Sequence, residues 1–191
     1  MKHFTYRENP RGKAILGMQI IWIGRDASLK YGDPANKIPK KRLPVYAQSL
    51  AEKLFHIGGD RIALVAEDDG IVDPGDLSKA GKLVEVSRTT LRKGAPNECH
   101  HNSLRLWKTC PKYRFATGYA LSDDGIWRRH SWLLNGTQTT IIETTEKRAA
   151  YFGFVYPPLA DVREAIRKPG TEDVPGMPFA KLAEAMFKVD D

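Results

Sequence analysis

The sequence predicts an α+β domain in which one cysteine-bearing helix packs on an antiparallel β-sheet. Gly94-Ala95-Pro96 interrupts regular secondary structure directly before a helical segment that begins at residue 97 with NECHHNSLRLW. Strand-like runs follow, and the dipeptides Asp124-Gly125 and Asn135-Gly136, which are typical of hairpin turns, separate them. The runs are YRFATGYAL (113–121), IWRRHSWLL (126–134) and TTIIETT (139–145). A helix and a strand meander therefore form the expected core, at residues 94–156.

Further helices, strands and loops are expected before and after this core. Apolar residues near helical spacing indicate a helix over 45–57 that ends at Gly58-Gly59. RIALVA (61–66) and KLVEVS (82–87) are expected strands, and 26–44 and 67–76 are expected loops. The tail after Pro157 is expected to hold two helices. Their segments are DVREAIRK (161–168) and PFAKLAEAMFKV (178–189).

Length and composition favour one domain spanning 1–191, with a basic part of unknown role at 1–90 and a helical tail at 157–191. Hydrophobic residues make up 41% of the chain and charged residues 28%, which is a soluble globular composition. The longest apolar run (14–24) is too short and interrupted for a bilayer span, and the first residues lack the pattern of a signal peptide. A cytoplasmic protein with no membrane contact is therefore expected.

The net charge of +7 is unevenly placed along the chain. Residues 1–58 hold 11 Lys or Arg against 4 Asp or Glu, whereas the remaining residues hold 19 of each. A surface for nucleic acid or an acidic protein partner would explain this excess, which includes KIPKKR (37–42). A solvated loop would explain it as well, because no aromatic residues interleave with these charges.

The segment NECHHN places Cys99, His100 and His101 side by side. Consecutive helical residues point about 100° apart, so these three cannot converge on one metal ion, and no metal is expected. Cys110 lies about 16 Å along the helix, too far for a disulfide. Asn97 is the predicted N-cap, so Cys99 falls in the first turn, where backbone N–H groups and the helix dipole stabilise a thiolate.

The same helix is expected to bury one stripe of side chains that begins at Cys99. Steps at helical spacing give its members as Ser103, Leu106, Trp107 and Cys110.

His130 and Glu143 are predicted to share one face of the sheet. A two-residue turn at Asn135-Gly136 makes Glu143 the diagonal neighbour of His130, and a four-residue loop places the two directly opposite. A three-residue loop would separate them, because a one-residue slip reverses the facing. With Cys99 this pair would supply an activated thiol, although each residue alone has an ordinary structural explanation.

Neighbouring residues have weaker expected roles. His100 and His101 are expected on the helix surface, and Trp132 in the core or along a substrate groove. Asn97 and Asn102 are candidates for lining the site or stabilising an oxyanion.

The chain from Gly94 to Gly153 resembles the papain-like superfamily in its broad sense, and transglutaminase-like domains in particular. ECHHN, ATGYAL, HSW, IIETT and YFG carry this likeness, which extends to short bacterial and phage proteins with a CHxN…GYA…HxW…ExT…YFG pattern. The resemblance implies a papain-like core with Cys99 as nucleophile, His130 as general base and Glu143 as orienting acid. Two departures are Glu143, where many relatives have Asp or Asn, and the absence of a Gln shortly before Cys99.

The expected function is that of a thiol-dependent enzyme, without a cofactor, that acts on amide or acyl bonds. Its substrate would be a protein, a peptide or a small amide, and it would act as a peptidase, amidase, deamidase or acyl transferase. The alternative is a non-enzymatic protein that binds nucleic acid or an acidic partner through its basic first part. A metal-dependent hydrolase built on Cys99, His130 and Glu143 is a third, weaker hypothesis.

Overall fold

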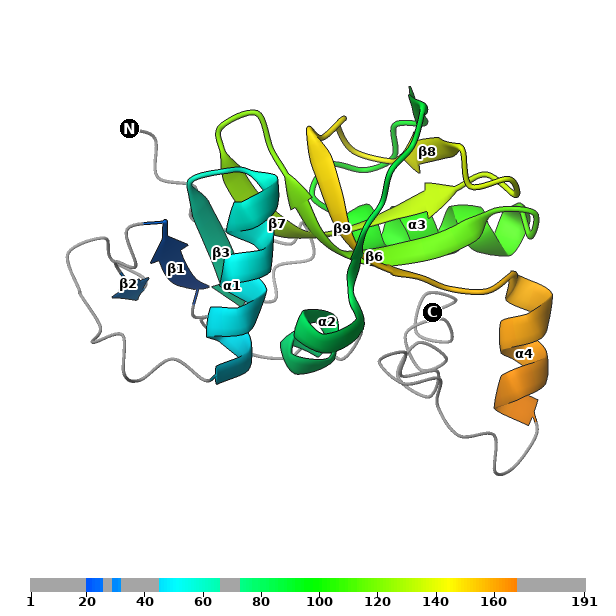
Figure 1. The fold of residues 1–191 in the computed structure, drawn as a ribbon. Helices are drawn as coiled ribbons and strands as arrows, with labels where there is room; N and C mark the ends of the chain where they lie inside the picture. The colour runs from blue at the N-terminus through cyan, green and yellow to red at the C-terminus, as the bar shows by residue number, and fades with distance from the viewer. Residues whose placement is uncertain (1–19, 26–28, 32–44, 66–72, 168–191) are drawn as a thin grey trace, which may run out of the picture.

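The computed structural model describes residues 20–25, 29–31, 45–65 and 73–167, and the statements below concern these residues. They form an α+β fold with one curled, mixed, nine-stranded sheet (Figure 1). The helices are α1 (Val45–Ile57), α2 (Pro74–Ala80), α3 (Cys99–Thr109) and α4 (Leu159–Arg167). The strands are β1 (Ile20–Gly24), β2 (Leu29–Tyr31), β3 (Arg61–Val65), β4 (Lys82–Leu83), β5 (Arg88–Leu91), β6 (Arg114–Leu121), β7 (Ile126–Leu134), β8 (Thr140–Glu143) and β9 (Ala150–Val155).

Strand β7 is the centre of the sheet, whose order is β2-β1-β3-β7-β6-β9-β4. One edge of β7 pairs with β6 over its whole length, from Leu134 opposite Arg114 to Trp127 opposite Leu121. The other edge is shared, because β3 pairs with residues 126–128 and β8 pairs with residues 133–134. Among the described strands, none covers residues 129–132 on that side. We call this uncovered stretch the β7 gap.

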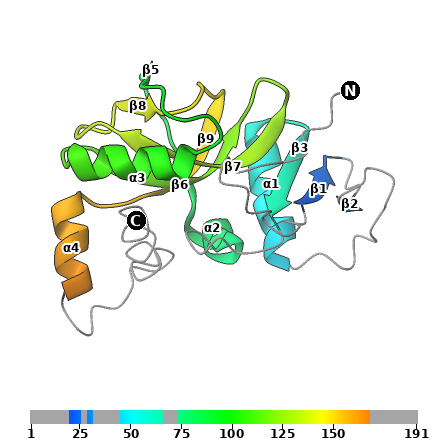
Figure 2. The same cartoon turned by 180° about the vertical axis from the view of Figure 1, so that it is seen from behind.

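All four helices contribute to one core. Figure 2 shows α3 in front of β6, on the side from which that view is taken. Leu50 and Leu54 of α1 are fully buried in this core, one helical turn apart, and Trp107 of α3 stacks on Phe115 with ring centroids 5.5 Å apart. This burial of apolar area is the main favourable contribution to folding. It also presses α3 against β6 and β7, which fixes where the first turn of α3 lies.

The opposite face of the sheet carries a smaller core. The segment between β4 and β5 crosses this face. In Figure 1 it passes in front of β9 and β6. Val84 on that segment packs against this core, and its N–H donates to the Tyr151 carbonyl at 2.8 Å. A Cβ on Gly153 would stand only 2.9 Å from Cη2 of Trp132, so a glycine there leaves room for the indole ring. Members of the smaller core are Ala116, Ala120, Trp132, Leu134, Ile141 and Tyr151.

Several predicted elements are confirmed. The helix over 45–57, the strand at 61–65, the three meander strands and the first tail helix are all present, with end shifts of a few residues. KIPKKR (37–42) and the second tail helix (178–189) lie outside the described residues. No helix in the described part of the chain is long and apolar enough to cross a bilayer.

Other predicted elements are wrong. The strand expected at 82–87 ends at Leu83, because this segment changes partners: Val84 bonds to β9, but Ser87 donates to the Thr139 carbonyl. Part of the expected loop 67–76 is the start of α2, where the Asp73 carboxylate accepts from two first-turn N–H groups and Pro74 occupies the first turn. Strand β2 lies within the expected loop 26–44, and β1, β5 and β9 were not predicted.

Candidate active site

The first turn of α3 lies at the β7 gap. The Ser131 N–H donates to the Cys99 thiol, and the Ser103 hydroxyl donates to the Ser131 carbonyl at 3.2 Å. Cys99 and Ser103 are four residues apart, so they share one face of the helix. Two side chains of α3 thus satisfy both backbone polar groups of one β7 residue, in place of a neighbouring strand.

The chain leading into α3 is held by Asn102 and not by the predicted cap. The Asn102 side chain accepts from the Ala95 N–H at 3.2 Å and donates to the Ala95 carbonyl at 2.7 Å. Asn97 is exposed with a φ of 62°, and the N-cap position belongs to Glu98, which makes no side-chain capping bond. The predicted Asn97 cap is wrong, because its left-handed backbone differs from the extended one of a capping residue. The first-turn N–H groups are therefore left without a side-chain cap.

His130 and Glu143 form a buried pair. His130 Nε2 lies 2.8 Å from Glu143 Oε1, and the two residues are 2% and 0% exposed. Because Nε2 is used in this contact, Nδ1 is the ring nitrogen left for Cys99, with which His130 also hydrogen-bonds. Cys99, His130 and Glu143 come from α3, β7 and β8, and the structure brings them together as one chain of contacts.

The turn that creates the pair is longer than the Asn135-Gly136 dipeptide indicates. The Asn135 N–H bonds to the Thr140 carbonyl, and the positive φ of 59° falls on Gln138. Leu134 consequently pairs with Ile141 instead of Thr137. Neither the two-residue turn nor the four-residue loop that places Glu143 directly opposite His130 is formed. The shift is four residues, an even number, so Glu143 still faces the same side as His130.

Glu143 is held by two further donors. The Thr144 N–H lies 3.2 Å from Oε2, and the Tyr151 hydroxyl also hydrogen-bonds to the carboxylate. The Tyr151 oxygen in turn accepts from the Arg148 N–H at 3.1 Å. Burial raises the pKa of Tyr151 far above its ordinary value, and the Glu143 charge adds to this, so the hydroxyl remains a donor.

Aromatic rings enclose His130. The Trp132 ring lies nearly parallel to it at 6.2 Å, and the Tyr151 ring lies 6.5 Å away. Trp132 is 0% exposed and packs on Tyr151 at 5.1 Å, so it is a core residue and not an open groove wall. The imidazole therefore has little freedom to rotate away from Cys99 and Glu143.

The thiol and the imidazole shift each other's pKa. Burial raises the pKa of Cys99, but the hydrogen bond and charge of His130, together with the Ser131 N–H, bring it below the ordinary 9.0. Burial lowers the pKa of His130, but its bonds to Cys99 and Glu143 outweigh burial and raise it to about 9. Both shifts favour a thiolate beside an imidazolium at neutral pH.

His100 belongs to a polar network between α3 and the sheet, whereas it was expected on the helix surface. Ser131 Oγ donates to Thr117 Oγ1 at 2.8 Å and so accepts from His100 Nδ1, with which it is in hydrogen-bond contact. Burial and the nearby charges of Arg129, His130 and His101 lower the pKa of His100 to about 3. A neutral histidine therefore stands directly after the thiol.

The buried face of α3 only partly follows the predicted stripe. Ser103 and Trp107 are buried as expected, but Leu106 and Cys110 are half-buried, and Asn102 and Leu104 complete the buried face instead. His101 is exposed, and both cysteines are free. Helical spacing from Cys99 leaves His100 off the stripe, so the sequence carried no signal for its role.

No group of three or more His, Cys, Asp or Glu side chains among the described residues is arranged to hold a metal ion. No protein-family model, curated protein or solved structure matches the chain. The geometry of the site itself is therefore the basis for a functional conclusion.

Proposed function

We propose that this protein is a thiol-dependent enzyme that acts on amide or acyl bonds through Cys99, His130 and Glu143, on a papain-like core. One observation carries the proposal: a helix-start cysteine, a buried histidine and a buried glutamate converge from three elements in that order of contact. Such an order supplies a nucleophile, a proton carrier and a group that orients it. The substrate would be a protein, a peptide or a small amide.

The first half of the reaction forms a thioester. The Cys99 thiolate attacks the carbonyl carbon, a C–S bond forms, and the carbonyl electrons move onto oxygen. This oxyanion would lie near the Cys99 N–H, at the positive end of α3, where no side-chain cap competes. The His130 imidazolium then gives its proton to the leaving amine as the C–N bond breaks.

The second half releases the acyl group. Neutral His130 takes a proton from water, or from an acceptor amine, as that group attacks the thioester carbon. The C–S bond breaks and the electron pair returns to sulfur, which restores the thiolate. Glu143 accepts from Nε2 throughout and stabilises each imidazolium that forms. Water as the acceptor gives hydrolysis, and an amine gives transfer.

The proposal is tested by alkylating the protein with iodoacetamide from about pH 4 to pH 9 and following each cysteine by peptide mass spectrometry. Cys110 serves as the internal control, because no histidine contact is recorded for it among the described residues. We expect Cys99 to react well below the pH at which Cys110 does. In a His130→Ala variant the two rates should converge, since the imidazolium that lowers the Cys99 pKa is lost.

Equal pH profiles for Cys99 and Cys110 in the unmodified protein would contradict the proposal. So would a low-pH reaction of Cys99 that persists unchanged in the His130→Ala variant. In either case the thiol would not be activated by its neighbour.

A further inference from the structure

The stretch from residue 88 to residue 114 is strongly basic. It holds seven Lys or Arg and a single acid, Glu98. Five of these cations are exposed. Arg105 lies on α3, and of the other four, three lie around β5 and one lies after the end of α3. We call these four residues the basic ridge: Arg88, Arg92, Lys93 and Lys112.

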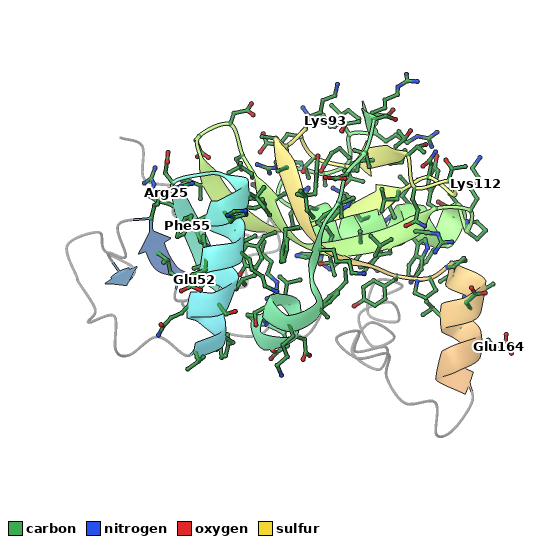
Figure 3. The ribbon with its side chains drawn as sticks, in the orientation of Figure 1. Arg25, Glu52, Phe55, Lys93, Lys112 and Glu164 are labelled. Atoms are coloured by element: carbon green, nitrogen blue, oxygen red, sulfur yellow. The ribbon has the colours of Figure 1, made fainter. Side chains whose placement is uncertain are left out.

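Two segments of the ridge meet at one aromatic ring. The Arg92 guanidinium lies 5.8 Å, and the Lys112 ammonium 5.9 Å, from the centre of the buried Tyr113 ring. Figure 3 shows Lys93 and Lys112 pointing outward from the β8 and α3 part of the molecule, far from Glu52 on α1. No ion pair recorded among the described residues joins a ridge cation to an acid. Within the described part of the chain, the ridge is thus a positive surface whose cations form no ion pair.

The ridge borders the candidate active site. The Arg92 N–H donates at 2.7 Å to the backbone carbonyl of Glu143, whose carboxylate binds His130. Two residues later, the Gly94 N–H donates at 2.7 Å to the Thr144 carbonyl, and the chain then enters α3 at Cys99. A molecule bound at the Arg92 and Lys93 end of the ridge therefore lies beside the segment that leads to Cys99.

Strand β5 offers an open edge beside the ridge cations. It pairs with β8 through residues 88–91 and with no other described strand. An extended peptide can add to such an edge through backbone hydrogen bonds while its side chains meet the neighbouring charges.

We propose that the basic ridge binds acidic polypeptide segments and presents them to Cys99, so that the substrate class is an amide or acyl group flanked by Asp or Glu. This inference rests on the proposed function for its chemistry, but binding can be measured separately. Nucleic acid fits less well, because the reaction acts on acyl carbon and no base-stacking platform lies at the ridge: among the residues whose side-chain exposure the structure describes, Tyr46 on α1 is the one exposed large aromatic.

The test measures fluorescence anisotropy of a labelled peptide of alternating Glu and Gln with the Cys99→Ala protein, which cannot turn it over. A ridge variant carries Arg88→Gln, Arg92→Gln and Lys112→Gln. A control variant loses three exposed cations elsewhere, through Lys53→Gln, Lys79→Gln and Arg163→Gln. We expect the ridge variant to bind about tenfold more weakly than the control, with affinity falling as salt is added. A peptide with Lys in place of Glu should not bind.

Three results would overturn the inference. They are no binding of the acidic peptide, equal affinity of the ridge and control variants, and tighter ridge-dependent binding of a single-stranded oligonucleotide of equal charge. The pH profiles of iodoacetamide alkylation test the proposed thiol enzyme separately from peptide binding by the ridge. With Cys99 restored, the ridge variant should keep the low-pH reaction of Cys99. Ridge-dependent peptide binding without that reaction would refute the thiol enzyme and leave the binding surface standing.

Discussion

His130 links the thiol to the acid through its two ring nitrogens. Burial alone would keep this imidazole neutral, because a charge removed from water loses its solvation. The Cys99 and Glu143 contacts reverse that preference and raise the pKa of His130 to about 9. An imidazolium that stays charged at neutral pH can both stabilise a thiolate and supply a proton to a leaving group.

Replacing Glu143 with Gln should lower the pKa of His130 from about 9 toward its ordinary 6.5, since a neutral amide cannot stabilise the imidazolium as a carboxylate does. The titration of the His130 ring protons by NMR measures this pKa in the variant and in the unmodified protein. Glu146→Gln is the matched control, because Glu146 is exposed and pairs with Arg148 in the same loop. A His130 midpoint that remains near 9 in Glu143→Gln would show that the carboxylate does not set it.

The three residues of the candidate site could be found from the sequence, whereas their supporting contacts could not. Cys99 comes shortly after Gly94-Ala95-Pro96, which prevents a helix from starting earlier. His130 and Glu143 could be paired because alternate residues of a strand face the same side of the sheet. The donors that hold Glu143 and the network around His100 depend on the order of the strands in the sheet. Long-range packing determines this order. Asn97 shows the limit at single-residue scale, because it suits a cap by type but has a left-handed backbone.

At the scale of elements, the site exists because β7 has two partial neighbours on one edge. β3 covers its first residues and β8 its last, and α3 fills the interval with Cys99 and Ser103. Backbone groups that are left unpaired and buried are costly, so the helix start is held at this place by the need to satisfy Ser131. Cys99, the proposed nucleophile, thereby becomes part of the sheet's hydrogen bonding.

Meander strands were predictable because strong alternation and hairpin dipeptides are local signals. The α2 helix spans only seven residues and follows a run of acidic and glycine residues, so local propensity pointed to a loop. Strands β4 and β5 are short, and β4 pairs with β9 whereas β5 pairs with β8. The hydrophobic periodicity of the sequence does not indicate such a change of pairing partner. The face shared by His130 and Glu143 was robust to the wrong turn length, since only the parity of the shift matters.

Two glycines test how tightly the start of α3 is held. A Cβ on Gly94 would lie 2.5 Å from Asn102 Cγ, so Gly94→Ala should displace the amide that clamps Ala95 and cost about 1–3 kcal/mol. Gly136→Ala is the matched control, because its Cβ would meet only the Lys112 carbonyl at 3.3 Å; we expect a change below about 1 kcal/mol. Urea denaturation of both variants measures the costs. Equal costs would mean that the Asn102 clamp contributes little to stability.

At the scale of the whole molecule, polar chemistry is concentrated where the two cores of the sheet adjoin. The α3 side contributes the Ser103, Ser131 and Thr117 network, and the other face contributes the rings around His130. The two faces meet at the β7 gap, where Cys99 reaches His130. α3 and strands β6 to β9 must therefore all be folded to assemble the site, and the site's titrating groups must in turn affect stability.

His100 provides a test of that coupling, because its pKa is lowered from 6.5 to about 3 in the folded protein. Protonation of His100 therefore favours the unfolded chain. The contribution of neutral His100 to the free energy of unfolding is complete above pH 6.5 and is lost as pH falls toward 3, by up to about 1.4 kcal/mol per pH unit. His100→Asn removes this titration but keeps an N–H donor for Ser131. Between about pH 7 and pH 4.5, denaturation should show the unmodified protein losing roughly 1–3 kcal/mol more than the variant. His101→Asn, which changes the exposed neighbour, should follow the unmodified protein, and identical losses in all three would contradict a His100 that is neutral in the folded protein.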